Sequence, residues 1–202
     1  MSQGSDRDFV VAWQRIARRI RVPFGFVSAL IYLFVLSRHQ PGHAQIAWSL
    51  LLTVPGVWLR GYAAGYVKKN RELTTTGPYA WSRNPLYLGS MMIAAGFAVA
   101  LGSWFVGALL IVGFLLIYIP VILGEERFLR ANFPGFDEYC RRVPRLLGLR
   151  HQPTQSDPGK GRFSFELYGR HREYRAALGV ALLYACLIFL APYLGALWSS
   201  PR

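Results

Sequence analysis

Apolar residues are concentrated in long blocks along this chain, and polar residues fall between the blocks. The blocks cover roughly 22–37, 44–66, 85–101, 103–123 and 176–198. Most of them approach the about 20 residues that a helix needs to cross a lipid bilayer. The pattern therefore predicts an all-α, polytopic membrane protein with about five transmembrane helices.

The basic residues predict the orientation of these helices, because Lys and Arg accumulate on cytoplasmic loops. They cluster before the first block, between the second and third blocks, and after the fourth block. Of the loops on the opposite side, one holds Arg38 with two histidines and the other consists of Gly102 and Ser103. We therefore expect a cytoplasmic N-terminus and a functional site that faces the cytoplasm, in the inner membrane if the source is a bacterium.

The composition agrees with a membrane protein and argues against other classes. Of the 202 residues 53% are hydrophobic, yet the formal net charge is +13, a combination that soluble domains rarely show. The basic residues form no contiguous arm, so nucleic acid is not an expected partner. Metal is not expected either, because Pro41-Gly42 interrupts the helix that would align His39 with His43.

Local patterning divides the chain into four parts. Residues 1–21 are charged and amphipathic, with no cleavable leader pattern, and predict a helix lying in the membrane interface. Residues 22–148 form the expected membrane core. Residues 149–175 are expected to be a cytoplasmic linker, since 151–161 is rich in Pro, Gln, Ser and Gly. Residues 176–202 form the expected C-terminal transmembrane helix.

Two polar segments beside predicted spans hold more aromatic, basic and acidic residues than a connecting turn requires. In the first, Gly77-Pro78 predicts a turn and Pro85 the first turn of a helix. The free backbone N–H groups there, with Arg83, predict a site for an anion such as a carboxylate. The alternative is that Arg83 is an ordinary cytoplasmic arginine beside an interfacial belt of Tyr and Trp.

The second segment begins with the adjacent acids Glu125 and Glu126 at the end of a predicted span. A carboxylate close to hydrocarbon is costly and is usually paired. Two interpretations stay open. The acids form structural ion pairs with Arg60, Arg83 or Arg142, or they hold a cationic or hydroxyl-bearing ligand.

Four motifs in this order resemble one family of enzymes. They are Gly77-Pro78-Tyr79, Arg83-Asn84-Pro85-x-Tyr87-x-Gly89, Glu125-Glu126 and Val143-Pro144-Arg145. Separated by a helical hairpin, they resemble the isoprenylcysteine carboxyl methyltransferases and their phospholipid methyltransferase relatives over about 60–148. Asn84 differs from the His usual in eukaryotic members, and Phe136 stands where Tyr is common.

This resemblance implies an S-adenosylmethionine-dependent methyltransferase with its catalytic region at about 60–148. The residues implied to hold the cofactor are Tyr79, Arg83, Asn84, Pro85, Tyr87, Gly89, Glu125 and Glu126. The candidates for catalysis or for binding the acceptor are Arg60, Glu126, Arg142 and Arg145. The implied acceptor is a lipophilic small molecule or a lipidated compound reached through the membrane lipids, either a prenylcysteine-like or isoprenoid carboxylate or a lipid amine.

Two other functions stay open from the sequence. Sterol-reductase-like enzymes, which use NADPH, also place an Arg before an Asn/His-Pro-x-Tyr motif, although they carry it near the C-terminus of a longer chain. A non-catalytic membrane scaffold or lipid-binding protein would need no cofactor. Binding of S-adenosylmethionine, of NADPH or of neither distinguishes the three functions.

Overall fold

The structure is a computed structural model that describes residues 25–36, 41–68, 72–147 and 161–190, together with Ile16, Arg19 and Pro23. These residues contain helices and loops and no strand, so the all-α class is confirmed for this part of the chain. The interfacial helix expected over 1–21 lies outside the described residues apart from Ile16 and Arg19, and so does the polar stretch before Gly161.

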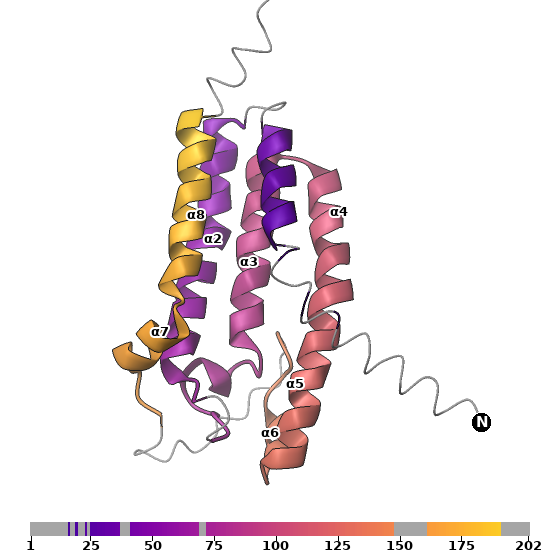
Figure 1. The fold of residues 1–202 in the computed structure, drawn as a ribbon, viewed down its shortest axis with the longest axis vertical. Coiled ribbons are helices and arrows are strands. Elements are labelled where there is room, and N and C mark those ends of the chain that lie inside the picture. The colour runs from indigo at the N-terminus through magenta and orange to yellow at the C-terminus, as the bar shows by residue number, and fades with distance from the viewer. Residues whose placement is uncertain are drawn as a thin grey trace, which may run out of the picture.

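Long helices run side by side along the molecule, and short helices gather at one end (Figure 1). The long helices are Gly25–Leu36, α2 (His43–Tyr66), α3 (Pro85–Leu101), α4 (Trp104–Gly113) continued by η2 (Phe114–Tyr118) and α5 (Ile119–Asn132), and α8 (Tyr174–Ala185) continued by η3 (Cys186–Leu190). The short helices are η1 (Gly77–Ala80), α6 (Phe136–Arg142) and α7 (Phe165–His171). The helices expected at 44–66 and 85–101 thus lie where the apolar blocks placed them.

The structure supports the predicted membrane spans less strongly than it supports the predicted helix positions. In the described part of the chain, Trp104–Asn132, of 29 residues, is long and apolar enough to cross a bilayer. A second such helix is counted if α7 and Tyr174–Leu190, which meet at a bend of 66°, form one span. Gly25–Leu36 and Pro85–Leu101 are apolar but shorter. A five-span topology and its orientation therefore remain predictions.

The outer faces of the long helices carry large apolar side chains that no other part of the described chain covers. Examples are Trp48 and Trp58 on α2, Trp104 and Ile111 on α4, and Leu182 on α8, each more than half exposed. Soluble proteins rarely expose apolar surface on this scale. Such a surface is compatible with the membrane location expected from the sequence.

Helices α2 and α3 pack closely because glycines face each other across the contact. A Cβ on Gly56 would lie 2.8 Å from the carbonyl oxygen of Gly89, and one on Gly89 would lie 2.7 Å from that of Gly56. Gly96, further along α3, faces Ser49 and Thr53 in the same way. Small residues at such contacts let the two backbones approach each other.

A buried core joins several of the long helices near the end of the bundle opposite the short helices. Tyr32, Phe97, Leu101 and Leu187 come from Gly25–Leu36, α3 and the helix that continues α8, and they are buried together. Within this core the Tyr184 hydroxyl hydrogen-bonds Ser49 at 2.7 Å and Thr53 at 2.8 Å. These bonds attach α8 to α2 and satisfy the buried hydroxyl groups of all three residues.

The helix from Trp104 to Asn132 contains one wide turn, η2, in which the hydrogen bonds skip one more residue than in an α-helix. Pro120 follows in the first turn of α5. A proline ring clashes with the carbonyl of the residue four positions earlier and lacks the N–H that would bond it. The wide turn accommodates both effects without breaking the helix.

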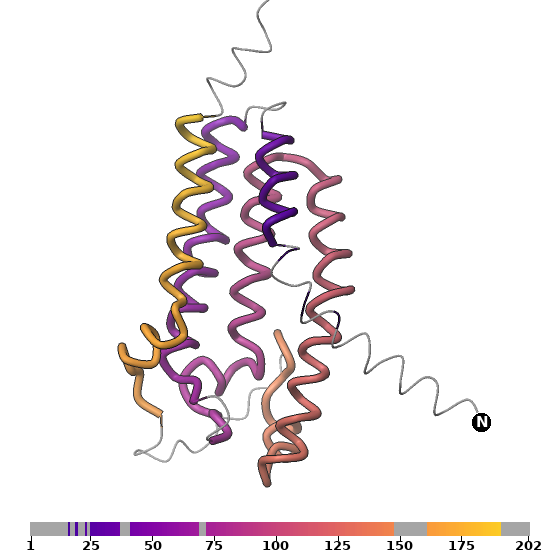
Figure 2. The backbone as a smooth tube through the Cα atoms, in the orientation of Figure 1, coloured from indigo at the N-terminus to yellow at the C-terminus, as the bar shows by residue number. Residues whose placement is uncertain are grey.

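The chain changes direction sharply between α7 and α8, and α7 lies beside the end of α2 (Figure 2). Arg172 makes this turn with φ of 55°, in the left-handed region. Helix α7 is held against α2 by the Phe163 ring over Gly65 and by the His171 ring, whose Nδ1 lies 3.1 Å from the carbonyl oxygen of Ala64. Part of the stretch expected as a linker is therefore an ordered helix.

Candidate functional site

A cavity of about 230 Å³ lies at the end of the bundle where the short helices gather. Its walls come from the end of α2, the loop after it, η1, the first turn of α3, α5 and α6. The lining residues are Val67, Lys68, Glu72, Leu73, Thr74, Tyr79, Arg83, Asn84, Pro85, Leu86, Tyr87, Glu125, Phe128, Leu129 and Tyr139. The cavity thus lies between the two polar segments that the sequence singled out.

The first polar segment is held in place by its own turn and by hydrogen bonds to the last residues of the second polar segment. Gly77 takes a φ of 60° directly against the Tyr66 ring, where a side chain would clash, and Pro85 begins α3. The backbone N–H of Arg83 then donates to the carbonyl of Pro144 at 2.9 Å, and the Asn84 amide donates to that of Arg145 at 3.0 Å. Asn84 is therefore a hydrogen-bonding residue that joins the two segments.

The adjacent acids of α5 have different environments, because successive residues of a helix point about 100° apart. Glu125 is exposed, lines the cavity and accepts a 2.8 Å hydrogen bond from the Tyr87 hydroxyl. Glu126 is buried and does not line the cavity. Its carboxylate lies 3.3 Å from Arg83 and pairs with Arg145 through two contacts. Glu126 therefore forms one of the structural ion pairs considered from the sequence.

Arg83 lies at the boundary between this ion pair and the cavity. Its Nη1 faces Glu126 and also donates to the Cys140 sulfur, while the residue lines the cavity. Its Nε is buried and has no hydrogen-bond partner among the described residues. A buried guanidinium N–H without a partner is costly, so this edge of Arg83 is suited to an anionic or carbonyl ligand.

Two tyrosines close the cavity on the α6 side. The Tyr139 hydroxyl donates a 2.6 Å hydrogen bond to the backbone carbonyl of Tyr79. Burial raises the pKa of the Tyr79 hydroxyl, and it raises that of Tyr139 against the opposing effect of Arg83. Both side chains are therefore neutral at physiological pH and present polarisable ring faces rather than charge.

The structure brings most of the residues implied for the cofactor together in one cavity. Tyr79, Arg83, Asn84, Pro85, Tyr87 and Glu125 line it. Gly89 lies elsewhere, in the contact between α2 and α3, and Glu126 lies behind Arg83. Tyr139 also lines the cavity, although the sequence interpretation gave it no cofactor role. No local motif indicates this position, which follows from the contact between Tyr139 and Tyr79.

The arginines considered for the acceptor are distributed differently. Arg145 is half exposed and paired with Glu126, which raises the pKa of its guanidinium through their hydrogen bonds. Arg142 pairs with Glu138, one helical turn away. Neither lines the cavity beside Tyr79. Arg60 lies in the bundle, where it lines a second cavity.

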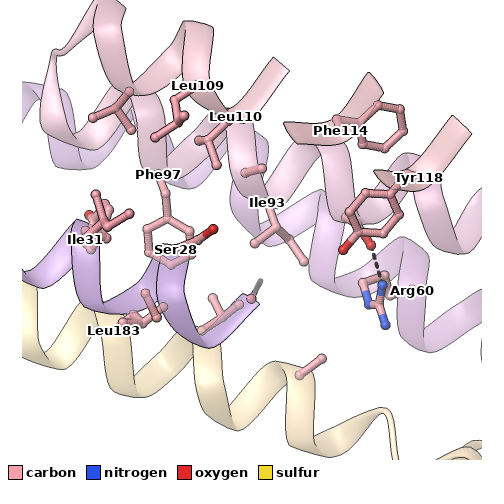
Figure 3. Close-up of a pocket in the computed structure, with 18 residues that line it drawn as sticks. Ser28, Ile31, Arg60, Ile93, Phe97, Leu109, Leu110, Phe114, Tyr118 and Leu183 are labelled. Carbon is pink, nitrogen blue, oxygen red and sulfur yellow. Dashed lines mark hydrogen bonds between the residues drawn. The ribbon is translucent and has the colours of Figure 1, made fainter. Parts of the chain in front are cut away.

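This second cavity measures about 310 Å³ and is almost wholly apolar. It lies between Gly25–Leu36, α3, the α4–η2 helix and α8, and Ile31, Ile93, Phe97, Leu110 and Leu183 are among its lining residues. Arg60 and Tyr118 lie together at one end of it (Figure 3). The Tyr118 hydroxyl has no hydrogen bond within the described part of the chain. An apolar cavity with a charged end is suited to a lipophilic molecule with a polar head group.

Arg60 is paired with Glu173, a residue absent from the sequence-based candidates. Its Nε and Nη2 lie 2.8–3.1 Å from the Glu173 carboxylate oxygens. Its Nη1 donates to the Leu86 carbonyl at 3.3 Å and to the Ser90 hydroxyl. Glu173 follows Arg60 by 113 residues; the one local signal was a single acid between the basic residues Arg172 and Arg175.

Comparisons with known proteins bear on the middle of the chain. Residues 41–135 match the family model described as phospholipid methyltransferase, which confirms the family resemblance over this segment. The match includes Arg60, the motif at 83–89 and Glu125-Glu126. It ends before Val143-Pro144-Arg145 and covers neither Gly25–Leu36 nor α7 and α8.

Two curated proteins are similar to the chain, each over 94 residues. The chain is 39% identical over 94 residues to the nickel-cobalt-cadmium resistance protein NccN of Alcaligenes xylosoxydans xylosoxydans and 42% identical over 94 residues to the cobalt-zinc-cadmium resistance protein CzcN of Cupriavidus metallidurans. Each match covers 46% of this chain and 43% of the relative, so the chain spans less than half the length of these relatives. No solved structure matches the chain significantly.

Proposed function

We propose that this protein is a membrane methyltransferase that uses S-adenosylmethionine to methylate a lipophilic acceptor. The observation that carries the proposal is the relation of the two cavities. One is polar and aromatic and lies at the end of the bundle, and the other is apolar and lies within it. Helix α3 lines both, with its first turn at the polar cavity and Ser90 to Phe97 at the apolar one. The match of residues 41–135 to a methyltransferase family supports the same reaction class.

The residues of the polar cavity fit the chemical groups of S-adenosylmethionine. The Glu125 carboxylate suits an ammonium or ribose hydroxyls, and the unpartnered Nε of Arg83 suits a carboxylate. The neutral rings of Tyr79 and Tyr139 suit the flat adenine and the positive sulfonium. When bound, the cofactor supplies an electrophilic methyl group on a positively charged sulfur.

The protein's own task in such a reaction is to align the reactants and exclude water, since no nucleophilic side chain is required. The wall between the cavities is well placed for this. Arg60 contacts the Leu86 carbonyl from the apolar side, and the Tyr118 ring meets the Tyr87 ring edge to face at 5.6 Å. We propose that Glu126 and Arg145 act as positioning residues, because they hold Arg83 and the segment beside it.

The proposed location follows the charge pattern. The polar cavity lies beside basic loops expected to be cytoplasmic, where the soluble donor is available, while the acceptor reaches the apolar cavity from the bilayer. An acceptor with a carboxylate needs no general base, whereas an amine must lose a proton, and Glu125 would be the nearest base. A bacterial source would place the protein in the inner membrane.

Ligand titration of the detergent-purified full chain tests the function. We expect S-adenosylmethionine to bind and NADPH not to bind. Glu125→Gln should weaken S-adenosylmethionine binding at least about tenfold by removing one negative charge from the cavity. Asp137→Asn, at an exposed pair with Arg130, is the matched control and should bind normally. Binding of NADPH alone would favour the reductase alternative, and binding of neither would favour the scaffold.

A labelling experiment identifies the acceptor class. Membranes that contain the protein are incubated with donor carrying a labelled methyl group, and the lipid and protein fractions are then separated. Label in an alkali-labile ester indicates a carboxylate acceptor, and alkali-stable label in a lipid indicates an amine. No transfer by a protein that binds the donor would contradict the proposed reaction.

A further inference from the structure

The Arg60–Glu173 pair stands at the polar end of an otherwise apolar cavity, and the proposed function assigns no role to Glu173. The Arg60 and Glu173 side chains are largely buried, at 22% and 15% exposure, and share the bidentate contact that guanidinium and carboxylate groups prefer. Arg60 lines the cavity, and Glu173 is held against Arg60 although it does not itself line the cavity. The pair is therefore more than a surface contact.

We infer that the Glu173 carboxylate occupies, on Arg60, the place that the carboxylate of a lipophilic acceptor takes when it binds. This inference rests on the proposed methyl transfer and specifies the acceptor as a lipophilic carboxylic acid. The C-terminal helix thereby both completes the acceptor site and closes it with a carboxylate of its own.

The groups around the polar end favour an anion over a cation. Arg60 offers a permanent positive charge, and the Tyr118 hydroxyl, at the same end of the cavity (Figure 3), has no hydrogen bond within the described residues and can donate one. An ammonium head group at this end would be repelled by the guanidinium. It would find no unpaired carboxylate there, because Glu173 is already bound to Arg60. A carboxylate replaces Glu173 with a group of the same charge and shape.

The position of Glu173 in the chain allows such an exchange. It lies between the left-handed residue Arg172 and the first turn of α8, at the 66° bend between α7 and α8. A residue at a bend of this kind shifts through a few backbone angles without unpacking a helix. The rest of α8 stays attached to α2 through Tyr184, deep in the bundle.

Arg60 remains anchored when Glu173 leaves. Its Nη1 bonds the Leu86 carbonyl and the Ser90 hydroxyl, both on α3, while Nε and Nη2 are the two atoms that Glu173 uses. The guanidinium thus has one edge fixed to the scaffold and one edge available for a carboxylate.

Binding of matched twelve-carbon probes to the full chain in lipid nanodiscs tests the inference. The probes are dodecanoate, dodecanol and dodecylamine. We expect the wild type to bind dodecanoate in preference to the other two probes. Glu173→Gln should raise the affinity for dodecanoate about tenfold, because an anionic competitor is removed, and leave that for dodecanol unchanged. Arg60→Gln should abolish the preference for dodecanoate.

Two results would overturn the inference. Equal weakening of all probes by Glu173→Gln would make Glu173 a purely structural residue, and preferential binding of dodecylamine that this substitution abolishes would make it a cation ligand. Donor titration of the same samples separates this test from that of the function. Absence of donor binding in every sample would reject the methyl transfer, whereas a failed probe result with donor binding intact would reject the carboxylate exchange alone.

Discussion

Arg145 holds Glu126 by both oxygens, with Nε 3.0 Å from Oε1 and Nη2 2.8 Å from Oε2. The partners differ in environment, since the Glu126 side chain is 6% exposed and that of Arg145 is 48% exposed. Arg83, on the buried side, shares the same carboxylate. Glu126 therefore joins two chain segments behind the wall of the polar cavity.

The two adjacent acids should respond differently to the same substitution. Glu126→Gln leaves the buried Arg83 without its carboxylate and should lower the free energy of unfolding by about 2 kcal/mol. Glu125→Gln affects an exposed group and should cost less than about 0.5 kcal/mol while it weakens donor binding. Reversible unfolding in mixed micelles measures both. A Glu126→Gln protein as stable as Glu125→Gln would contradict the structural role.

Alkaline pH should reveal the tyrosine pair beside the cavity. Burial raises the pKa of Tyr139 and Tyr79 above the ordinary value of 10.0. Because the folded state favours the protonated forms, their contribution to stability is complete below about pH 10 and is lost as the pH rises through the raised values. Absorbance titration at alkaline pH should show both ionising only together with unfolding.

Tyr139→Phe serves as the matched variant for that titration. It removes one late-ionising group and the 2.6 Å hydrogen bond to the Tyr79 carbonyl, which should cost about 1–2 kcal/mol. Its titration curve should lack one tyrosine in the late phase. If the early, ordinary phase loses a tyrosine instead, Tyr139 is accessible to solvent and the buried geometry is wrong.

Close packing of α2 on α3 should make substitution of Gly56 by alanine far more destabilising than the same substitution at Gly179. Gly56→Ala forces a Cβ against the Gly89 backbone, which cannot yield as a side chain does, and should cost about 1–3 kcal/mol or more. A Cβ on Gly179 in α8 meets nothing within 4 Å, so Gly179→Ala should be neutral or stabilising by up to about 1 kcal/mol. Equal thermal stability of the two variants would contradict the packing.

The buried tyrosine hydroxyls of the bundle allow a second pair of matched variants to be compared. Tyr184→Phe removes the hydrogen bonds to Ser49 and Thr53 and should cost about 0.6–2 kcal/mol, the range for bonds between membrane helices. Tyr32→Phe removes a buried hydroxyl that has no partner among the described residues and should leave stability unchanged or raise it. Unfolding of both variants under one condition measures the difference; the reverse order of stability would refute the assignment.

Local sequence predicted those features that depend on neighbouring residues. Apolar length located α2 and α3 to within a residue, and Gly77, Pro78 and Pro85 determined the turn and the helix start that bring Arg83 and Tyr87 to one cavity. The block at 103–123 marked the apolar part of its helix rather than the helix itself. The helix continues to Asn132 because the polar residues that follow also favour helix.

Contacts between distant segments could not be predicted in this way. Nothing near Arg60 indicates Glu173, and nothing near Tyr79 indicates Tyr139, because such pairs arise from the path of the whole chain. The family resemblance supplied the candidate cofactor residues and included Gly89 among them, because a motif does not distinguish a glycine needed for packing from one needed for binding. The position of Gly89 against Gly56 follows from the three-dimensional contact alone.

The wide turn at Phe114–Tyr118 has a consequence for changes in chain length. Such a turn absorbs one extra residue without altering the rotational phase of the helix beyond it. A single-residue deletion within 114–118 should therefore leave Glu125 beside Tyr87 and Glu126 beside Arg145. The same deletion at Ile122, in regular α-helix, rotates everything after it by about 100° and separates both contacts. Changes in length between related chains should therefore be tolerated at this wide turn and at few other points of the helix.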